Sequence, residues 1–206
     1  MAIAVLGLAS SARRRGNTAA LLDRALEGAA AAGADTSRVD LCRLRIAPCL
    51  ACDGCYQDGI CVVRDDFQAV LDQLLSADAV ILASPLYFMG VTGWAKAFID
   101  RGQCLYARKY ILHQPLPPAR DGRPRRGIFL STGGQPRADF SGAVLTVKTW
   151  FKTMDTIYLG DVLRRNVDEA GKILEDPTAL AEAYRLGWAL VRLPEWQPEW
   201  SSCSGG

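Results

Sequence analysis

The chain is 206 residues long, 50% hydrophobic and 22% charged, with a formal net charge of +2 at pH 7. This length and composition favour one globular domain with a substantial core and exclude a disordered chain. The nearly balanced charge gives no reason to expect binding to nucleic acid or to a membrane surface, and no apolar run approaches the eighteen or so residues that a membrane span requires.

The first half of the chain alternates between apolar runs and helical patterns. Residues 2–8 form a short apolar run that ends in a loop, which predicts a buried parallel strand. A helix is predicted from residue 17 up to the glycine at 33, and residues 37–42 predict a second strand. After a cysteine-rich loop, a helix is expected over 65–75, because its apolar residues share one stripe and its leading aspartates suit the helix dipole.

The second half continues the alternation. Strands are predicted at 79–84, 127–131 and 156–163, and helices at 93–104, 143–154 and 177–191. The stretch 112–126 is rich in proline, arginine and glycine and predicts an irregular excursion. Two groups of arginines are expected to lie in solvated loops: Arg13, Arg14 and Arg15, and Arg120, Arg123, Arg125 and Arg126. The sole histidine, His113, is expected to be structural or exposed, and no catalytic acid or base is predicted.

Alternating strands and helices predict an α/β fold with a parallel sheet that is covered on both faces. Five strands fit the flavodoxin-like, doubly wound order 2-1-3-4-5, with the cysteine-rich loop after the second strand. We expect a single domain over 1–193 and a tail over 194–206, whose Trp196 and Trp200 either dock on a neighbour or fray. In such sheets ligands bind at the carboxyl ends of the strands near the switch point, here in three loops: 9–18, 85–93 and 132–140.

Four cysteines lie within thirteen residues, in the sequence P-C-L-A-C-D-G-C-Y-Q-D-G-I-C; they are Cys49, Cys52, Cys55 and Cys61. A 4Fe–4S cluster takes four cysteines at this spacing, because short gaps let the side chains converge on one small core. Structural zinc usually divides its ligands into two separated pairs, and a metal-free loop is the third interpretation. The total of seven cysteines is odd and no basic leader precedes the first strand, so we expect no disulfide framework and a reducing, cytoplasmic location.

The first loop has the features of an anion site. Hydroxyl groups, an arginine and a Gly-Asn-Thr turn precede a helix, whose start offers unpaired N–H groups and a positive dipole end. A monophosphate is expected, because the Gly-x-Gly-x-x-Gly pattern of dinucleotide sites is absent. The alternative is that Asn17 or Thr18 merely caps the helix. The candidate residues are Ser10, Ser11, Arg13, Gly16, Asn17 and Thr18.

The second and third loops could hold a flat aromatic cofactor. Such a ring needs backbone donors for its polar edge and apolar side chains for its faces. The candidates in the second loop are Pro85, Leu86, Tyr87, Phe88, Met89 and Gly90. Alternatively, Tyr87, Phe88 and Trp94 are ordinary core or subunit-contact residues. The third loop adds a glycine-rich turn at a neighbouring strand end, with candidates Thr132, Gly133 and Gly134.

These loops resemble the NAD(P)H-dependent FMN reductase superfamily, and within it the iron–sulfur flavoproteins. The phosphate pattern S-P-R-x-x-G-N-T is matched by residues 11–18, with Ala12 in place of proline. The ring-loop pattern S-P-x-Y-x-x-x-x-T-G-x-x-K-x-F-I-D-R is matched by residues 84–101. The cysteine run lies just after the second predicted strand, which is where the iron–sulfur branch of the superfamily carries its compact cysteine motif. The similarity covers residues 2–163.

The resemblance implies an FMN flavoprotein whose phosphate would sit on Ser10, Ser11, Arg13, Asn17 and Thr18. The flavin ring would lie against residues 85–90, and a 4Fe–4S cluster would be bound by the four cysteines. It further implies electron transfer between FMN and the cluster, NAD(P)H as a possible donor, quinone-like or small redox acceptors, and a homodimer or homotetramer. Two alternatives stay open: a cluster-free NAD(P)H-dependent FMN or quinone reductase, and a flavin- or zinc-binding redox sensor without turnover.

Overall fold

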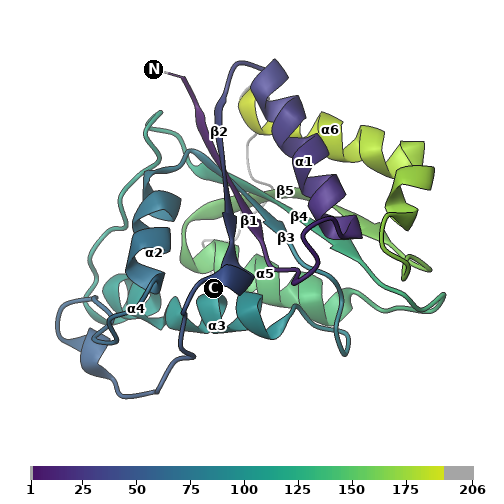
Figure 1. Cartoon of the computed structure of the whole chain (residues 1–206). Coiled ribbons are helices and arrows are strands. Elements are labelled where there is room, and N and C mark those ends of the chain that lie inside the picture. The colour runs from purple at the N-terminus through teal and green to yellow at the C-terminus, as the bar shows by residue number, and fades with distance from the viewer. Residues whose placement is uncertain (1, 193–206) are drawn as a thin grey trace, which may run out of the picture.

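The computed structural model describes residues 2–192 and contains one parallel sheet between two layers of helices (Figure 1). The strands follow the order β2-β1-β3-β4-β5, which confirms the predicted flavodoxin-like fold. Their bounds are β1 Ala4–Ala9, β2 Asp35–Asp40, β3 Ala79–Ala83, β4 Arg125–Thr132 and β5 Thr156–Arg164. The central strand β3 is buried along its whole length, as an apolar strand covered on both faces should be.

Each face of the sheet has its own helical layer and its own apolar core (Figure 1). One layer consists of α1 (Asn17–Ala31) and α6 (Pro177–Arg192). The other layer consists of α2 (Phe67–Ser76), α3 (Gly93–Arg101), α4 (Gln103–Tyr106) and α5 (Ser141–Thr153). The connections that leave the carboxyl ends of the strands therefore gather at one edge of the molecule, where the predicted site loops lie.

The predicted helix over 93–104 is interrupted. It consists of α3 and α4, which meet at Gly102, and it continues as a π-helical turn over Ala107–Ile111. An added Cβ at Gly102 would stand 2.8 Å from the carbonyl oxygen of Ile99, so the break occurs where only glycine fits. The cysteine loop packs on this broken segment, because Gly59 lies against the stem of Arg108.

The expectation that Arg125 and Arg126 lie in a solvated loop is wrong. Both residues begin β4 and are buried. The Arg125 guanidinium donates to the carbonyl oxygens of Leu75, Ala77 and Met154, where α2 and α5 end. Helix ends leave such carbonyls without partners, and a buried guanidinium has enough donors to satisfy several of them. Burial lowers the pKa of Arg125 from its usual value.

Helices α1 and α6 cross in contact at two glycines. A Cβ on Gly187 would fall on the carbonyl oxygen of Ala25, and a Cβ on Gly28 would fall on that of Tyr184. Neither oxygen can move away without disturbing its own helix. The two glycines therefore allow the helix backbones to touch and cover their face of the sheet without a gap.

Replacing Gly187 by alanine should lower the free energy of unfolding by about 2 kcal/mol, because the added methyl group overpacks a backbone contact. Urea denaturation followed by circular dichroism measures the change. Gly93→Ala is the matched control, since a Cβ at that position meets nothing within 4 Å. Equal stability of the two variants would contradict a close α1–α6 contact.

Between residues 2 and 192, no helix is both long enough and apolar enough to cross a lipid bilayer. The expectations for Trp196, Trp200 and the tail lie outside the described residues.

Candidate functional site

Loops from β1, β3 and β4 meet around a small cleft of about 90 Å³, which we call the phosphate-loop cleft. A fourth segment, which follows β5, closes it. Its lining residues are Ser11, Arg13, Gly16, Asn17, Thr18, Pro85, Leu86, Tyr87, Thr132, Gly134, Val167 and Asp168. The topology thus brings together candidates from all three predicted loops at the carboxyl edge of the sheet.

The start of α1 faces this cleft without a side-chain cap. Gly16 occupies the N-cap position, and no side chain bonds the first N–H groups of the helix. Asn17 and Thr18 therefore do not act as caps, which was the alternative interpretation. The first turn also contains no acidic residue. Free N–H groups, the positive end of the helix dipole and Arg13 make this corner suited to an anion.

The segment that follows β5 was missed by the sequence analysis. The Asn17 side chain donates to the carbonyl oxygen of Glu169 at 2.8 Å and accepts from the N–H of Ile173 at 3.2 Å. Arg13 donates to the carbonyl oxygen of Asp168 at 3.0 Å. Asn17 thus joins the phosphate loop to the last connection of the sheet. Ligands bind at the carboxyl ends of strands in such sheets. Applied to β5, this rule would have predicted that the segment after β5 belongs to the site.

Five predicted residues do not line the phosphate-loop cleft: Ser10, Phe88, Met89, Gly90 and Gly133. Ser10 is buried behind it, where its hydroxyl donates to Ala83 O at 3.2 Å and its carbonyl oxygen accepts from the Thr92 hydroxyl at 3.0 Å. Ser10 therefore ties the first loop to the second from behind the cleft.

Residues 87–90 form a tight turn at the open side of the cleft. Tyr87 and Gly90 exchange two backbone hydrogen bonds of 2.9 Å, and the central residues Phe88 and Met89 have φ angles of 49° and 61°. Bulky residues rarely adopt this left-handed conformation, and they pay roughly 1–2 kcal/mol each for it. Phe88 is nevertheless fully exposed, at 106% of its reference area. A flat ring bound here would lie on an open surface beside the turn, because the cleft is far smaller than the roughly 300 Å³ of a small-molecule pocket.

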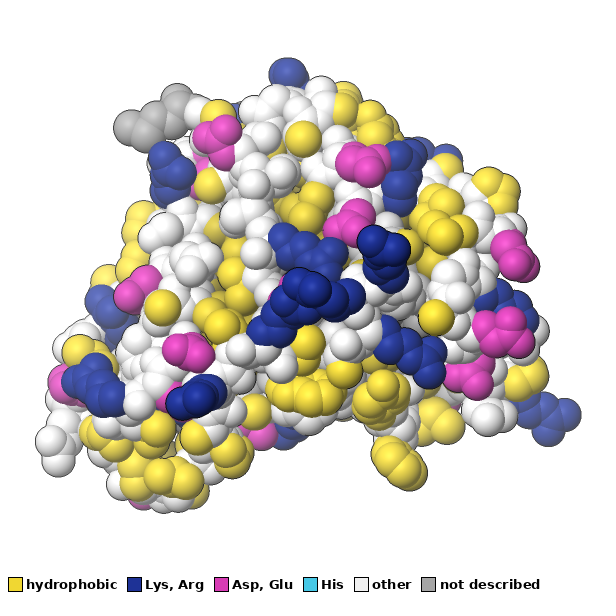
Figure 2. All heavy atoms as spheres, viewed as in Figure 1, with side chains coloured by type: hydrophobic (Ala, Val, Ile, Leu, Met, Phe, Trp, Pro, Cys, Tyr) yellow, Lys and Arg dark blue, Asp and Glu magenta, His cyan; other side chains and the backbone are white. Residues whose placement is uncertain are grey.

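The four cysteines of the run line one cavity of about 340 Å³, which we call the cysteine cavity. Cys49, Cys55 and Cys61 are half-buried and Cys52 is exposed, and exposed apolar side chains gather over the loop that carries them (Figure 2). Burial, and after it the neighbouring cysteine thiolates, raises the pKa of the Cys55 thiol. Across residues 2–192, no three potential ligands are already gathered around a single ion position. The four cysteines of the run instead line the cysteine cavity together, so each could offer a sulfur ligand to a group bound there.

A fifth thiol faces the same cavity. Cys104 belongs to α4, lines the cavity and is almost completely buried. Burial, together with nearby Cys61 and Cys55, raises its pKa to about 12. Cys104 is the most deeply buried of the five thiols that line the cavity. Cys42 lies elsewhere, with its thiol directed at the carbonyl oxygen of Ser11 at 3.2 Å.

The cysteine loop is anchored by a buried ion pair. Arg101, the last residue of α3, donates to Asp65 Oδ2 at 2.7 Å and to Cys61 Sγ at 3.2 Å. Asp65 also accepts from the N–H groups of Ala47 and Phe67. Burial alone would raise the pKa of Asp65, but the Arg101 hydrogen bond and the two N–H groups outweigh it and hold that pKa below its usual value.

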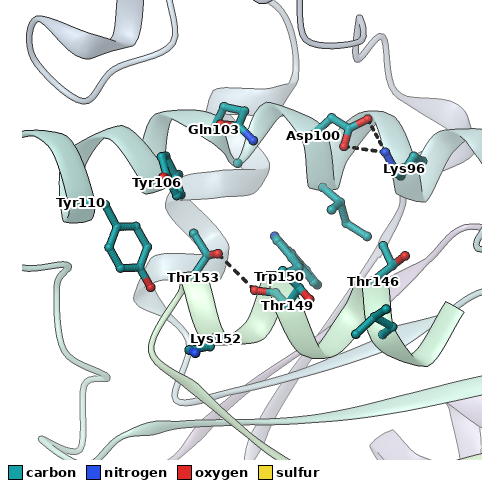
Figure 3. A pocket seen from close by; sticks show the side chains of 13 residues that line it. Lys96, Asp100, Gln103, Tyr106, Tyr110, Thr146, Thr149, Trp150, Lys152 and Thr153 are labelled. Atoms are coloured by element: carbon teal, nitrogen blue, oxygen red, sulfur yellow. Dashed lines mark hydrogen bonds and ion pairs between the residues drawn. The ribbon is translucent and has the colours of Figure 1, made fainter. Parts of the chain in front are cut away.

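A wider groove of about 570 Å³ runs between α3, α4 and α5 (Figure 3). Tyr106 and Tyr110 stand at one end of it, and the ion pair between Lys96 and Asp100 lies at the other. The groove runs along helices that cover one face of the sheet. It shares Asp100 and Gln103 with the cysteine cavity, so the two hollows adjoin.

A family model described as NADPH-dependent FMN reductase matches residues 3–164. An iron–sulfur flavoprotein of Methanocaldococcus jannaschii is 37% identical over 101 residues, which are 49% of this chain and 52% of that protein. The chain thus spans about half the length of this relative. A second iron–sulfur flavoprotein of the same organism is 30% identical over 158 residues, covering 76% of this chain and 74% of the relative.

Among solved structures, an FMN-dependent NADH-azoreductase from Bacillus anthracis in complex with FMN has a similar fold. The TM-score is 0.67 at 15% identity, and the match covers 93% of this chain and 100% of the other. At this identity the likeness concerns the fold alone.

Proposed function

The chain belongs to the NADPH-dependent FMN reductase family, and from that premise we propose that it is an FMN-binding oxidoreductase that transfers electrons between FMN and a 4Fe–4S cluster. The family match confirms the resemblance found in the sequence, and relatives named iron–sulfur flavoproteins support the finer proposal. One observation carries it: all four cysteines of the run line a single cavity, in a chain whose three predicted site loops converge on another cleft.

The phosphate-loop cleft would hold the FMN phosphate. The N–H groups at the start of α1 and the Arg13 guanidinium supply donors, with hydroxyl groups from Ser11 and Thr18 beside them. Gly16 lets the phosphate loop turn back closely on itself, because a Cβ at this position would stand 3.0 Å from Arg13 Cβ. Ser10 and Asn17 would hold the loop in shape, and the flavin ring would rest against residues 85–90, with Thr132, Gly133 and Gly134 beside it.

The cysteine cavity fits a cluster better than a single zinc ion. Structural zinc usually divides its ligands into two separated pairs, whereas the first three cysteines of this run follow one another at two-residue gaps. The four cysteines line one space of about 340 Å³, which is large enough for an inorganic core. A donor set made only of cysteine is also what such a core requires.

Together the two groups would supply complementary chemistry, because FMN exchanges a hydride with a donor such as NAD(P)H while a cluster carries one electron at a time. The chain itself would position them. No side chain of the cleft is required as a general acid or base in this proposal. The exposed side chains of Tyr87, Phe88 and Met89 support a contact with a second subunit or a redox partner at the flavin edge, as expected for a homodimer or homotetramer.

Arg13→Ala should raise the dissociation constant for FMN by about 10- to 150-fold, equivalent to roughly 1.5–3 kcal/mol for a charge-assisted phosphate contact. Fluorescence titration of the apoprotein with FMN measures this change. Arg14→Ala is the matched control, because Arg14 is exposed and does not line the cleft. Equal affinity of the two variants would remove Arg13 from the phosphate site.

The proposed function is tested by an anaerobic visible spectrum of the purified protein together with iron and acid-labile sulfide analysis. Flavin absorbance with about four iron and four sulfide per chain is the expected result. Flavin absorbance without iron, with full reduction of quinones by NAD(P)H, would replace the proposal with a cluster-free reductase. Stoichiometric zinc with a flavin that no donor reduces would indicate a sensor without turnover.

A further inference from the structure

Arg101 is a charged side chain with no access to solvent. Its side chain is 0% exposed, and its guanidinium lies 4.5 Å from the centre of the Phe67 ring. An arginine is charged at any physiological pH, and burying that charge is unfavourable unless partners compensate it. The partners of Arg101 therefore indicate what the burial achieves.

All hydrogen-bond partners of Arg101 belong to the cysteine loop or its base. Nη1 donates to the carbonyl oxygen of Ala47 at 3.1 Å and Nη2 to that of Val63 at 2.9 Å. These residues flank the cysteine run, one before Cys49 and one after Cys61. The guanidinium fork thus bridges the two ends of the loop and attaches both to α3. Lysine could not do so, because a single ammonium cannot reach several diverging acceptors at once.

The same side chain places its charge on one cysteine. Nε donates to Cys61 Sγ at 3.2 Å, while Asp65 compensates the other side of the guanidinium at 2.7 Å. Among the residues that line the cysteine cavity, Arg101 contributes the guanidinium and Asp53 and Asp100 contribute carboxylates. A positive charge next to a ligand sulfur stabilises the state of the bound group that carries more negative charge.

We propose that Arg101 is a positioning residue that closes the cysteine loop and raises the reduction potential of the cluster bound there. The loop-closing part follows from the contacts alone, and the potential-setting part rests on the proposed function. Arg101 does so through its hydrogen bonds to the two loop ends and to Cys61, without being a ligand itself.

The loop-closing part is tested on the cluster-free protein by hydrogen exchange with mass spectrometry. In Arg101→Gln, the amides of residues 47–63 should exchange at least tenfold faster than in the wild type, while those of α1 and α6 should be unchanged. Arg125→Gln is the matched control: it also removes a buried arginine bound to carbonyl oxygens, but at the other end of α2. Unchanged exchange over residues 47–63 in Arg101→Gln would overturn the loop-closing role. An equal increase there in Arg125→Gln would overturn it as well.

The potential-setting part is tested on reconstituted protein by a spectroelectrochemical titration of the cluster. Arg101→Gln should shift the one-electron reduction equilibrium about tenfold toward the oxidised form, which corresponds to 59 mV for one electron. Arg101→Lys retains the charge, so it should keep a potential near the wild type while its loop exchanges faster. Equal potentials in wild type and Arg101→Gln would overturn this role. A wild-type protein that takes up no iron would overturn both the proposed cluster and the potential-setting role. The exchange measurement would still decide the loop-closing role.

Discussion

Replacing Cys52 by serine should yield a protein that keeps its FMN but retains less than a quarter of the wild-type iron and sulfide. Cys52 lies in the middle of the run and lines the cysteine cavity with the other three cysteines. A cluster bound by three thiolates and a hydroxyl group loses much of its stability, because softer sulfur ligands are the ones that iron–sulfur cores select. Because Cys52 is exposed, the substitution itself should disturb the apoprotein little.

Iron and sulfide analysis after anaerobic purification measures the effect, and FMN content is the internal reference. Cys42→Ser is the matched control, since its thiol bonds Ser11 O outside the cavity and a serine hydroxyl can replace that bond. Full iron and sulfide in the Cys52 variant would show that the ligand assignment is wrong.

Replacing Asp65 by asparagine should lower the free energy of unfolding of the cluster-free protein by about 3–5 kcal/mol. The substitution removes the carboxylate that compensates Arg101, whose guanidinium is then a buried charge without a counterion. It also weakens the acceptors for the N–H groups of Ala47 and Phe67, which lie 2.9 and 3.0 Å from the carboxylate. Chemical denaturation at pH 7 measures the loss.

The acid dependence of stability gives a second measure of Asp65. Its pKa is lowered in the folded protein, so its contribution is complete above the unfolded value of about 3.9 and is lost as the pH falls through the lower, folded value. The difference in stability between the wild type and Asp65→Asn should therefore shrink below about pH 4. Asp139 and Asp176 also have lowered pKa values, and their acid dependence is common to both proteins.

Asp66→Asn is the matched control for this prediction. Asp66 is exposed, and its carboxylate accepts a hydrogen bond from the N–H of Arg45 at 2.7 Å rather than from a buried arginine side chain. Its substitution should cost about 1 kcal/mol or less, as expected for a single hydrogen bond at the surface. If both variants lose the same stability, the buried pair contributes nothing specific.

Some helix bounds and some buried charges depended on packing that local sequence does not show. The composition of 112–126 indicates a loop, yet Arg125 and Arg126 begin the interior strand β4 and are buried. The charge of Arg125 is tolerated because helix ends from distant parts of the chain supply carbonyl acceptors, and that of Arg126 because Asp121 pairs with it at 2.6 Å. Similarly, the helical pattern over 93–104 does not indicate the break at Gly102. Hydrophobic periodicity shows which side of a helix is apolar, but it does not show how closely other atoms approach the helix backbone.

The sequence by itself determined the sheet order, the position of the cysteine loop and the family. Alternating apolar runs and helical patterns are local, and the family loops at 11–18 and 84–101 are contiguous, so both can be found without knowing the fold. Only the tertiary structure decided which side chains support those loops. Arg101 meets Cys61 across 40 positions, and Asn17 and Arg13 meet the segment after β5 across more than 150. The contacts of Asn17 and Arg13 exist only once the parallel strands bring their carboxyl ends to one edge, and those of Arg101 only once α3 packs beside the cysteine loop. No spacing in the sequence encodes either set.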